Sequence, residues 1–272
     1  MTMRAHVSTP GLAHRTEGTR DIHRALPEEV PVALVFNGTT QAVMMATPVD
    51  LADFALGFAL TEGIITDPAQ VEEFEMVDHA NGIETRFWLS DDRAQALAKR
   101  RRTMAGPVGC GLCGIDSLEQ ALRSVPHVMT DLRLSASDVA RATDGLRNHQ
   151  SLHDLTRATH AAGFLLPGSG VVLAREDVGR HNALDKLIGA IVKQGIDPTQ
   201  GAAVMTSRLS VELVQKCALA GIPALIAVSA PTGAAVRLAE EAGITLAAFA
   251  RGGGFDLFSH PQRINDEAAD VA

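Results

Sequence analysis

The fold is decided by the stretch VVLAREDVGRHNALDK (Val171–Lys186), in which a short β-rich run passes into a helical one. Val171–Arg175 has the character of a buried strand, and Arg180–Lys193 has apolar residues at helical spacing. The polar residues between them lie where a strand ends and a helix begins, and ligands of open α/β sheets collect at such points. The stretch therefore predicts one strand–helix unit of an α/β domain, with a candidate binding position at its turn.

The same alternation of strand and helix continues on both sides of this stretch. We predict four further strands, at Gly163–Leu166, Ala202–Thr206, Ala224–Val228 and Ile244–Phe249. Helices are predicted at Leu209–Ala220 and Thr232–Glu241, and another, with a capping signal, at Ser135–His149. Two β-α-β steps with short apolar strands imply a largely parallel sheet covered by helices on both faces, that is, a three-layer α/β domain.

The N-terminal part of the chain is rich in predicted hairpins, which gives it an α+β character. Asn-Gly turn signals join two pairs of β-rich runs, Val30–Phe36 with Gln41–Ala46 and Val71–Val77 with Ile83–Leu89. Between the hairpins, the run Thr47 to Asp50 combines a capping residue, a proline and an acidic residue, and it predicts the start of an apolar helix. We therefore expect a sheet-rich subdomain before the α/β domain.

Four segments are predicted along the chain. Residues 1–20 contain no apolar run and are expected to form a flexible tail. Residues 21–104 form the N-terminal sheet-rich subdomain, and residues 105–116, where glycine and proline break all periodicity, form a mobile loop. Residues 117–272 form the α/β domain.

Composition narrows the possible functions. A formal net charge of −8 argues against a broad nucleic-acid surface, and no stretch approaches the ~20 apolar residues of a membrane span. The 3 cysteines cannot form a disulfide framework and fit a reducing cytosol, where thiols stay available for chemistry. We expect a cytoplasmic protein whose partners include neither nucleic acid nor membrane.

The loop GCGLCG, residues 109–114, is the main candidate for chemistry. It places Cys110 and Cys113 three residues apart among glycines, which suits close approach of a partner. The cationic run Lys99–Arg102 before it, and a helix start near Asp116, would both favour the nucleophilic thiolate. The sequence therefore predicts a reactive pair of thiols.

The cysteine pair alone leaves several functions open. A structural zinc site would need two more ligands, and the chain has no second C-x-x-C. A thioredoxin-like redox pair would lie at the end of a strand that opens a helix, whereas a Gly-Pro linker leads in here. A purely structural loop is the third alternative. Cys217 lies in the apolar helix Leu209–Ala220 and is predicted to belong to the core.

Several motifs between residues 28 and 264 resemble the FdhD family of formate dehydrogenase accessory proteins. The most specific of them is REDVGRHNALDK at Arg175–Lys186. Further matches are EVPVALV (29–35), MMATP (44–48), LGF (56–58), EGII (62–65), GCG with CG (109–114), THAA (159–162), VQK (214–216) and SHPQR (259–263).

The resemblance implies a sulfurtransferase that accepts persulfide sulfur from a cysteine desulfurase. The sulfur would pass to the molybdenum bis(molybdopterin guanine dinucleotide) cofactor, Mo-bis-MGD, before that cofactor enters formate dehydrogenase. The family places the persulfide on the first cysteine, which corresponds to Cys110, and Cys113 becomes the supporting thiol. A homodimer is also expected from the family.

The resemblance further implies a cofactor-binding loop after the final strand of the α/β domain. It corresponds to Ala250, Arg251, Gly252, Gly253, Gly254 and Phe255. Glycines let backbone N–H groups approach phosphate or pterin oxygens, and the Arg251 guanidinium suits a diphosphate. A guanine nucleotide such as GDP is expected to act as a partial mimic of the cofactor. The alternative is a flexible turn into a last strand at Phe255–Phe258, and Gly254 departs from relatives that have a basic residue there.

Arg180, His181 and Lys186 are candidate contacts to the nucleotide phosphates, because they follow the turn at which ligands collect. The alternative is that Asp177 caps the helix while Arg180 and His181 face solvent or a partner subunit.

Two other functions compete with the sulfurtransferase that the resemblance implies. The family's second domain resembles the cytidine deaminase fold, but a deaminase needs a glutamate two positions after its histidine ligand and a cysteine pair downstream. Here Ala162 follows His160 at that position and the cysteine pair lies upstream, so deamination is rejected. A chaperone that only binds and delivers the cofactor, with peripheral cysteines, remains the alternative.

Overall fold

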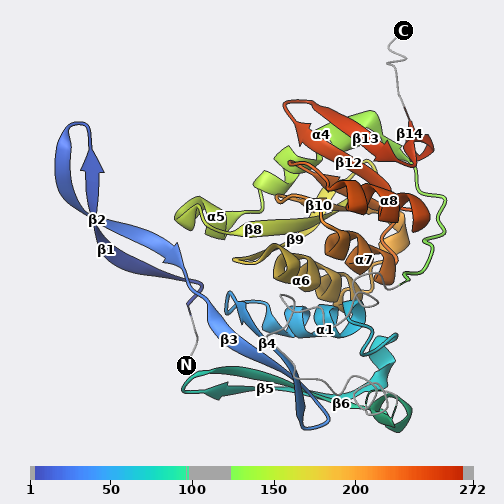
Figure 1. Ribbon diagram of the computed structural model, residues 1–272, viewed down its shortest axis with the longest axis horizontal. Helices are drawn as coiled ribbons and strands as arrows, with labels where there is room; N and C mark the ends of the chain where they lie inside the picture. The colour runs from blue at the N-terminus through green and yellow to red at the C-terminus, as the bar shows by residue number, and fades with distance from the viewer. Residues whose placement is uncertain (1–3, 96, 98–123, 266–272) are drawn as a thin grey trace.

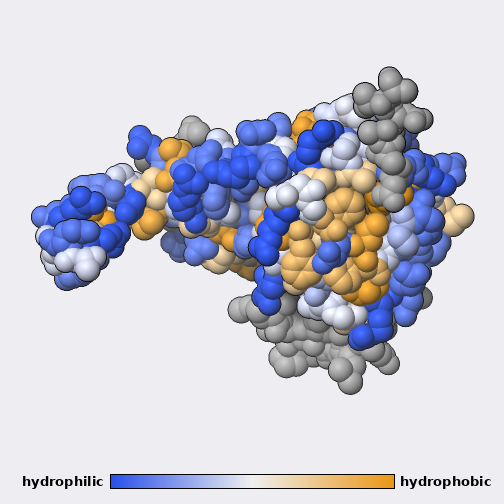
Figure 2. All heavy atoms as spheres, turned by 90° about the horizontal axis from the view of Figure 1, so that it is seen from above, coloured by the Kyte–Doolittle hydropathy of each residue, from blue (hydrophilic) through white to orange (hydrophobic). Residues whose placement is uncertain are grey.

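The computed structural model describes residues 4–95, 97 and 124–265 (Figure 1). A four-stranded sheet and a six-stranded sheet form the body, and a hairpin arm projects from it. Figure 2 shows that the arm is mostly hydrophilic, whereas hydrophobic residues gather on the upper side of the body. Within the part of the chain that is described, no helix is both long and apolar enough to cross a membrane.

The arm consists of β1 (His6–Arg15) and β2 (Gly18–Pro27), which pair antiparallel along their whole length. The prediction of an unstructured tail over residues 1–20 was therefore wrong for the residues from His6 onward. Most side chains of both strands are exposed, so the arm faces no core that would impose an apolar alternation on its sequence. That missing alternation is why the hairpin was not recognised.

The four-stranded sheet has the order β4-β3-β6-β5 and confirms both predicted hairpins. Its strands are β3 (Val30–Phe36), β4 (Thr39–Ala46), β5 (Val71–His79) and β6 (Gly82–Leu89). Helix α1 (Leu51–Thr61) packs on one face of the sheet, where its apolar side chains share a core with β3 and β6. The helix begins later than predicted, because Asp50 is its N-cap and Thr47 has another role.

The six-stranded sheet has the order β13-β12-β11-β10-β8-β9. Its strands are β8 (His160–Leu166), β9 (Gly170–Asp177), β10 (Ala202–Met205), β11 (Ala224–Ala227), β12 (Thr245–Arg251) and β13 (Gly254–Ser259). Only β10, β11 and β12 pair in parallel, and the other three pairings are antiparallel. The predicted largely parallel sheet was therefore wrong: tight turns at Gly168–Gly170 and Gly252–Gly253 make hairpins instead of helical crossovers.

Helices cover both faces of this sheet, which confirms the three layers. Helices α6 (Arg180–Lys193), α7 (Val211–Leu219) and α8 (Gly233–Glu241) share one core with it, and α4 (Ala136–Arg147) shares another core with its opposite face. The short helix α5 (Ser151–Thr156) follows α4, and β7 (Leu134–Ser135) pairs with β14 (Ile264–Asn265). The likeness to the cytidine deaminase fold stays a prediction.

The remaining regular elements are short. Residues 91–95 are helical, and the described part of the chain also contains three single-turn 3₁₀ helices. They are η1 (Pro68–Gln70), η2 (Pro198–Gln200) and η3 (Pro261–Arg263).

The two sheets are joined through α1 and α6, which lie side by side (Figure 1). Gly57 of α1 faces the backbone of Asp185, and Gly189 of α6 faces the backbone of Asp53, so the two helices approach closely. The buried Asp53 carboxylate also lies 2.7 Å from both the Arg175 guanidinium and the Lys193 ammonium. Backbone contact and buried charge therefore join the two halves of the body. The predicted boundary near residue 104 lies outside the described residues and stays a prediction.

Candidate functional site

One edge of the six-stranded sheet collects most of the predicted binding residues. Strands β9, β10, β11 and β12 all run in one direction, as their pairings show, so their carboxyl ends meet at this edge. Ligands of open α/β sheets bind outside the carboxyl ends of the strands. We refer to this side of the sheet as the carboxyl edge.

Arg180 and His181 lie at the carboxyl edge, in the first turn of α6. The N-cap of this helix is Gly179, which offers no side-chain cap, so free backbone N–H groups face the same region as Arg180. Burial, together with the charges of Arg180 and Lys216, lowers the pKa of His181 to about 4. Burial and then Arg180 also lower the pKa of His160, which begins β8. The positive charge of Arg180, which contributes to both shifts, makes this end of the edge suitable for an anion.

Lys186 does not belong to the binding surface, which corrects its prediction as a nucleotide contact. Its side chain is fully buried, and its ammonium lies 2.7 Å from the carboxylate of Asp177. The same ammonium donates to the carbonyl oxygens of Thr47 and Glu176, at 2.9 and 3.3 Å. A lysine on the first turns of a helix is normally exposed, but here the connection from β4 to α1 covers it. The pair positions α6 instead of binding a ligand.

Asp177 is not the N-cap of α6, which was its alternative predicted role; the N-cap is Gly179. Its carboxylate accepts from the backbone N–H of Thr47 and Gly179 and from the side chain of Asn182, at 2.8 to 3.0 Å. The hydroxyl of Thr47 accepts in turn from the N–H of Val178. This buried network fixes the backbone between β9 and α6, and with it the position of Arg180.

The predicted cofactor loop is the turn between β12 and β13. Gly252 and Gly253 have φ values of 61° and 78°, and Arg251, Gly252, Gly253 and Gly254 are all exposed. The family resemblance implied that this loop follows the final strand of the domain. In the structure β13 and β14 come after it. Ala250 is buried and its carbonyl accepts from the Thr143 hydroxyl at 2.6 Å, so it supports the turn from behind. Phe255 is half-buried.

The two candidate binding elements share an edge but not a pocket. Between β9 and β12 lie three strands, so four steps of ~4.8 Å put the turn roughly 19 Å from the start of α6. The exposed Arg208, which follows β10, lies between them along the edge. Arg208 was not among the predicted site residues, although its position two residues after the predicted strand Ala202–Thr206 places it at this edge.

The two thiols of the predicted sulfur-carrying loop, Cys110 and Cys113, lie outside the described residues, as does the basic run before them. Cys217 is placed, and it confirms its predicted role in the core. It is buried in the cluster formed by α6, α7 and α8, and burial raises the pKa of its thiol to about 12. Such a thiol is neither ionised nor accessible near neutral pH.

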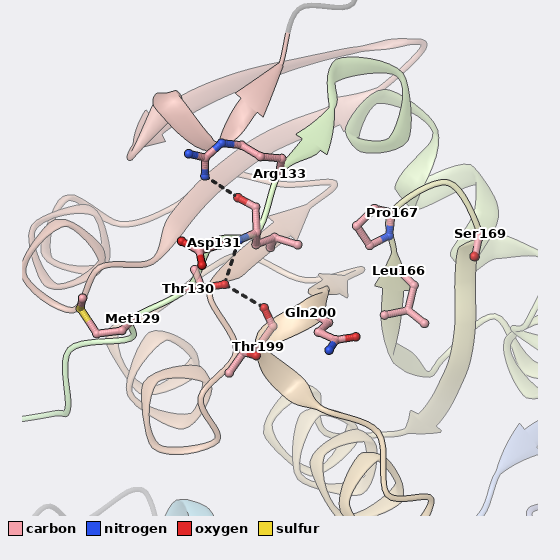
Figure 3. Close-up of a pocket in the computed structure, with 10 residues that line it drawn as sticks. Met129, Thr130, Asp131, Arg133, Leu166, Pro167, Ser169, Thr199 and Gln200 are labelled. Carbon is pink, nitrogen blue, oxygen red and sulfur yellow. Dashed lines mark hydrogen bonds between the residues drawn. The ribbon is translucent and has the colours of Figure 1, made fainter.

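A hollow with a volume of about 720 Å³ lies elsewhere, at the opposite edge of the sheet (Figure 3). Its walls come from the end of β8 and the turn to β9, from η2 and from the extended segment Met129–Arg133. Thr130 donates there to the carbonyl of Thr199 at 2.9 Å. None of the described residues that were predicted to bind the cofactor lines this hollow.

Comparison with known proteins decides the family. The model of the FdhD/NarQ family matches residues 27–265, which include both sheets of the body and the carboxyl edge. The chain belongs to the FdhD/NarQ family.

Members of the FdhD/NarQ family resemble this chain along most of its length. A protein of Agrobacterium fabrum named sulfur carrier protein FdhD is 52% identical over 242 residues, which cover 89% of each chain. A Brucella abortus protein of the same name is 51% identical over 254 residues, 93% of this chain and 94% of that one. A formate dehydrogenase accessory protein from Desulfotalea psychrophila has a crystal structure with a TM-score of 0.77 at 24% identity, covering 96% of this chain and all of that one. That structural likeness supports the fold.

Proposed function

We propose that this FdhD/NarQ protein is a sulfurtransferase that carries persulfide sulfur on Cys110 from a cysteine desulfurase to Mo-bis-MGD. The delivered sulfur would be required for the activity of formate dehydrogenase, to which the cofactor passes. The names of the relatives support the carrier role, since proteins about 50% identical are named sulfur carrier protein FdhD. The burial of the third cysteine, Cys217, supports placing the persulfide on the pair Cys110 and Cys113, and the family resemblance favours Cys110.

The single observation that carries the proposal is the burial of Cys217. The chain has 3 cysteines, and the thiol of Cys217 is inaccessible, with its pKa raised by burial. Sulfur held as a persulfide therefore requires Cys110 or Cys113, the two cysteines of the C-x-x-C sequence. We assign the persulfide to Cys110 and a supporting role to Cys113.

Sulfur uptake would be a thiol exchange. The Cys110 thiolate attacks the outer sulfur of the desulfurase persulfide, the S–S bond of the donor breaks, and the desulfurase cysteine leaves as a thiolate. The electron pair of that bond stays with the leaving thiolate, so uptake needs no external oxidant or reductant.

The carboxyl edge would hold the cargo. Arg251 and the glycine turn offer a guanidinium and approachable backbone N–H groups, and Arg180 stands beside the uncapped N-terminus of α6. Each of these two elements combines an arginine side chain with backbone N–H groups, and both kinds of group bind the oxygens of a diphosphate. Since they lie roughly 19 Å apart along the strands, a long dinucleotide-bearing ligand fits the edge better than a small anion does.

The experiment that tests the carrier role measures bound sulfur directly. The protein is incubated with a cysteine desulfurase and L-cysteine, and its intact mass is then recorded without reductant. We expect one added sulfur atom in the wild type and in Cys217→Ser, and none in Cys110→Ser. Cys110→Ser that retains the added sulfur contradicts the assignment. Normal formate dehydrogenase activity in a strain that lacks both loop thiols would favour a cofactor chaperone instead.

We also propose a homodimer in the cytoplasm, as the family resemblance implies. Sedimentation equilibrium of the purified chain measures its oligomeric state. Fractionation of cells that express it measures whether it is found in the cytoplasm.

A further inference from the structure

The hairpin arm leaves the body with two long strands that pair only with each other. β1 and β2 form a two-stranded sheet, and in the described part of the chain no third strand joins them. A hairpin of two strands is marginally stable by itself in water, and the free edge of a long strand is a site at which other proteins bind. The arm therefore presents surface that suits a partner from outside the chain.

One face of the arm carries arginines and no acidic residue. Residues that lie opposite each other in an antiparallel pair share a face, so Arg20 and Ala13 lie on the same face as Arg24 and Thr9, and Arg15 joins them. Neither strand contributes an aspartate or a glutamate to this face, which we call the arginine face. Arg20 and Arg24 are exposed, and neither guanidinium forms an ion pair with another described residue. In a chain with a formal net charge of −8, such a face indicates an acidic partner.

Apolar side chains lie among the arginines. Ile22 stands between Arg20 and Arg24, and Val7 lies opposite Leu26 at the base of the arm. Val7 and Leu26 are 39% and 42% exposed, and Figure 2 shows hydrophobic residues where the arm meets the body. Arginine is enriched in interfaces between proteins, whereas the contacts of permanent dimers are more hydrophobic than this face. The composition therefore favours a partner that binds and leaves.

The base of the arm lies beside the carboxyl edge of the six-stranded sheet. Glu176, close to the end of β9, accepts from the backbone N–H groups of Leu152 and His153, both at 2.8 Å. These hydrogen bonds fasten the start of α5 to the carboxyl edge, and α5 in turn contacts β2 (Figure 1). The arm thus projects from the end of the edge at which α6 begins.

The arginines stand well beyond the surface of the body. A strand rises about 3.3 Å per residue, so Arg24 and Arg20 lie roughly 10 and 23 Å along β2 from Pro27, at the base of the arm. They project past any small ligand held on the edge, into the space that an approaching protein occupies. A protein that collects a cargo from the carboxyl edge therefore passes the arginine face.

We propose that the arginine face of the arm docks the enzyme that receives the cargo, formate dehydrogenase, through a carboxylate-rich patch on the surface of that enzyme. This docking role rests on the proposed delivery of the cofactor to formate dehydrogenase, and it adds the surface at which the two proteins meet. Arginine binds carboxylates through two parallel hydrogen bonds, and complementary charge speeds the encounter of two proteins. No covalent step is involved.

The test measures binding to formate dehydrogenase that has been purified from cells lacking this protein. Surface plasmon resonance records the affinity of the full chain and its variants for the immobilised enzyme. In Arg20→Glu combined with Arg24→Glu, we expect the affinity to fall at least about tenfold, because attraction becomes repulsion. Arg20→Lys with Arg24→Lys keeps the charge and should bind more tightly than the glutamate variant. Added salt should weaken binding of the wild type.

The matched control is Arg141→Glu combined with Arg237→Glu. It changes the net charge by the same amount at exposed positions of α4 and α8, and it should bind as the wild type does. If the glutamate variant of the arm does not fold, Arg20→Gln with Arg24→Gln takes its place and should also weaken binding. Circular dichroism and sedimentation equilibrium monitor the fold and the oligomeric state of each variant.

Two results would overturn the docking role. One is an arm variant that folds and binds the enzyme as tightly as the wild type does. The other is an arm variant that loses only its self-association, which would assign the arginine face to a second copy of the chain. A wild type that does not bind formate dehydrogenase overturns the delivery step itself. The carrier role is tested separately, because arm variants should still acquire one sulfur atom on Cys110 in the mass assay.

Discussion

The ammonium of Lys216 lies 2.9 Å from both carboxylate oxygens of Asp185, deep in the body where α1, α6 and α7 meet. Neither side chain is more than 1% exposed. Thr61 of α1 donates to the same carboxylate and accepts from the same ammonium, at 2.8 and 2.9 Å. One buried ion pair thus links three helices that come from both halves of the chain.

Lys216→Met should destabilise the protein by about 3–5 kcal/mol, because it leaves the carboxylate of Asp185 buried without its partner. Lys216→Met combined with Asp185→Leu removes both charges and should recover part of the loss. Urea unfolding gives the free energies. The matched control is Arg86→Met, which breaks partly exposed contacts to Glu84 and Glu75 and should cost less than about 1 kcal/mol. Equal losses in both single variants would contradict the importance of burial.

Gly57→Ala and Gly189→Ala should each prevent normal folding or lower the melting temperature strongly. A Cβ at Gly57 would overlap the carbonyl of Asp185, and one at Gly189 would overlap the carbonyl of Asp53. Both obstacles are backbone atoms of the facing helix, which cannot turn aside. Gly233→Ala provides the control, since a Cβ there meets only the far end of Arg237 at 3.6 Å. Thermal unfolding followed by circular dichroism compares the three, and a stable Gly57→Ala would show that the helices can separate.

The free energy of unfolding should rise with pH between about 4 and 6.5, in part because of His181. Burial, Arg180 and Lys216 lower the pKa of His181 to about 4 in the folded chain, whereas an unfolded histidine titrates near ~6.5. Between these values the unfolded chain binds a proton that the folded chain excludes, so acid favours unfolding.

His181→Gln should remove this part of the pH dependence, up to about 3 kcal/mol. Denaturant unfolding at about pH 4 and at about pH 7.5 measures it, because the folded and unfolded pKa values of His181 lie between these limits. The difference between wild type and variant isolates His181 from His160, whose pKa is also lowered. An NMR titration that places His181 near ~6.5 would show that its environment is open to water.

Cys217 should not react with iodoacetamide in the native protein, because its thiol is buried and its pKa is raised to about 12. Peptide mass mapping after labelling should find the modification on Cys110 and Cys113 only. The same treatment in guanidinium chloride should label all 3 cysteines. Native labelling of Cys217 would remove the argument that assigns the persulfide to the C-x-x-C pair.

Local signals in the sequence predicted the elements that depend on neighbouring residues. Arg180–Lys193 forms a helix over the whole predicted range, and the Asn-Gly turns at Asn37 and Asn81 join the hairpins that they indicated. Helical spacing and turn chemistry are properties of short segments, so one sequence is enough to detect them.

The features that sequence did not predict depend on distant contacts. Lys186 is buried because Thr47, 139 positions away in the sequence, covers it. The residues next to Lys186 in the sequence do not indicate such a distant partner. Strand β8 runs opposite to β9 because the two form a hairpin. The apolar runs in the sequence do not show whether two strands are joined by a hairpin or by a crossover connection. Phe249 has a φ of +52° inside β12, at a bulge whose backbone contacts Thr143 of α4 and Ser229 beyond the end of β11. At the candidate site, the places of the residues in the sequence correctly indicated that they lie near the carboxyl edge. They did not indicate which of the side chains are exposed there.

The contact between Gly57 and Gly189 has a consequence for whether the two halves of the chain can exist separately, in the laboratory or in evolution. Cutting the chain between its two sheets would expose a glycine-lined helix surface and leave Asp53 without Arg175 and Lys193. It would also remove the hydrogen bonds that Thr47 donates to Asp177 and Thr61 donates to Asp185. Neither half should therefore be obtainable as a stable fragment. The sheet-rich half and the sheet that carries the carboxyl edge must be expressed, inherited and exchanged between proteins as a single unit.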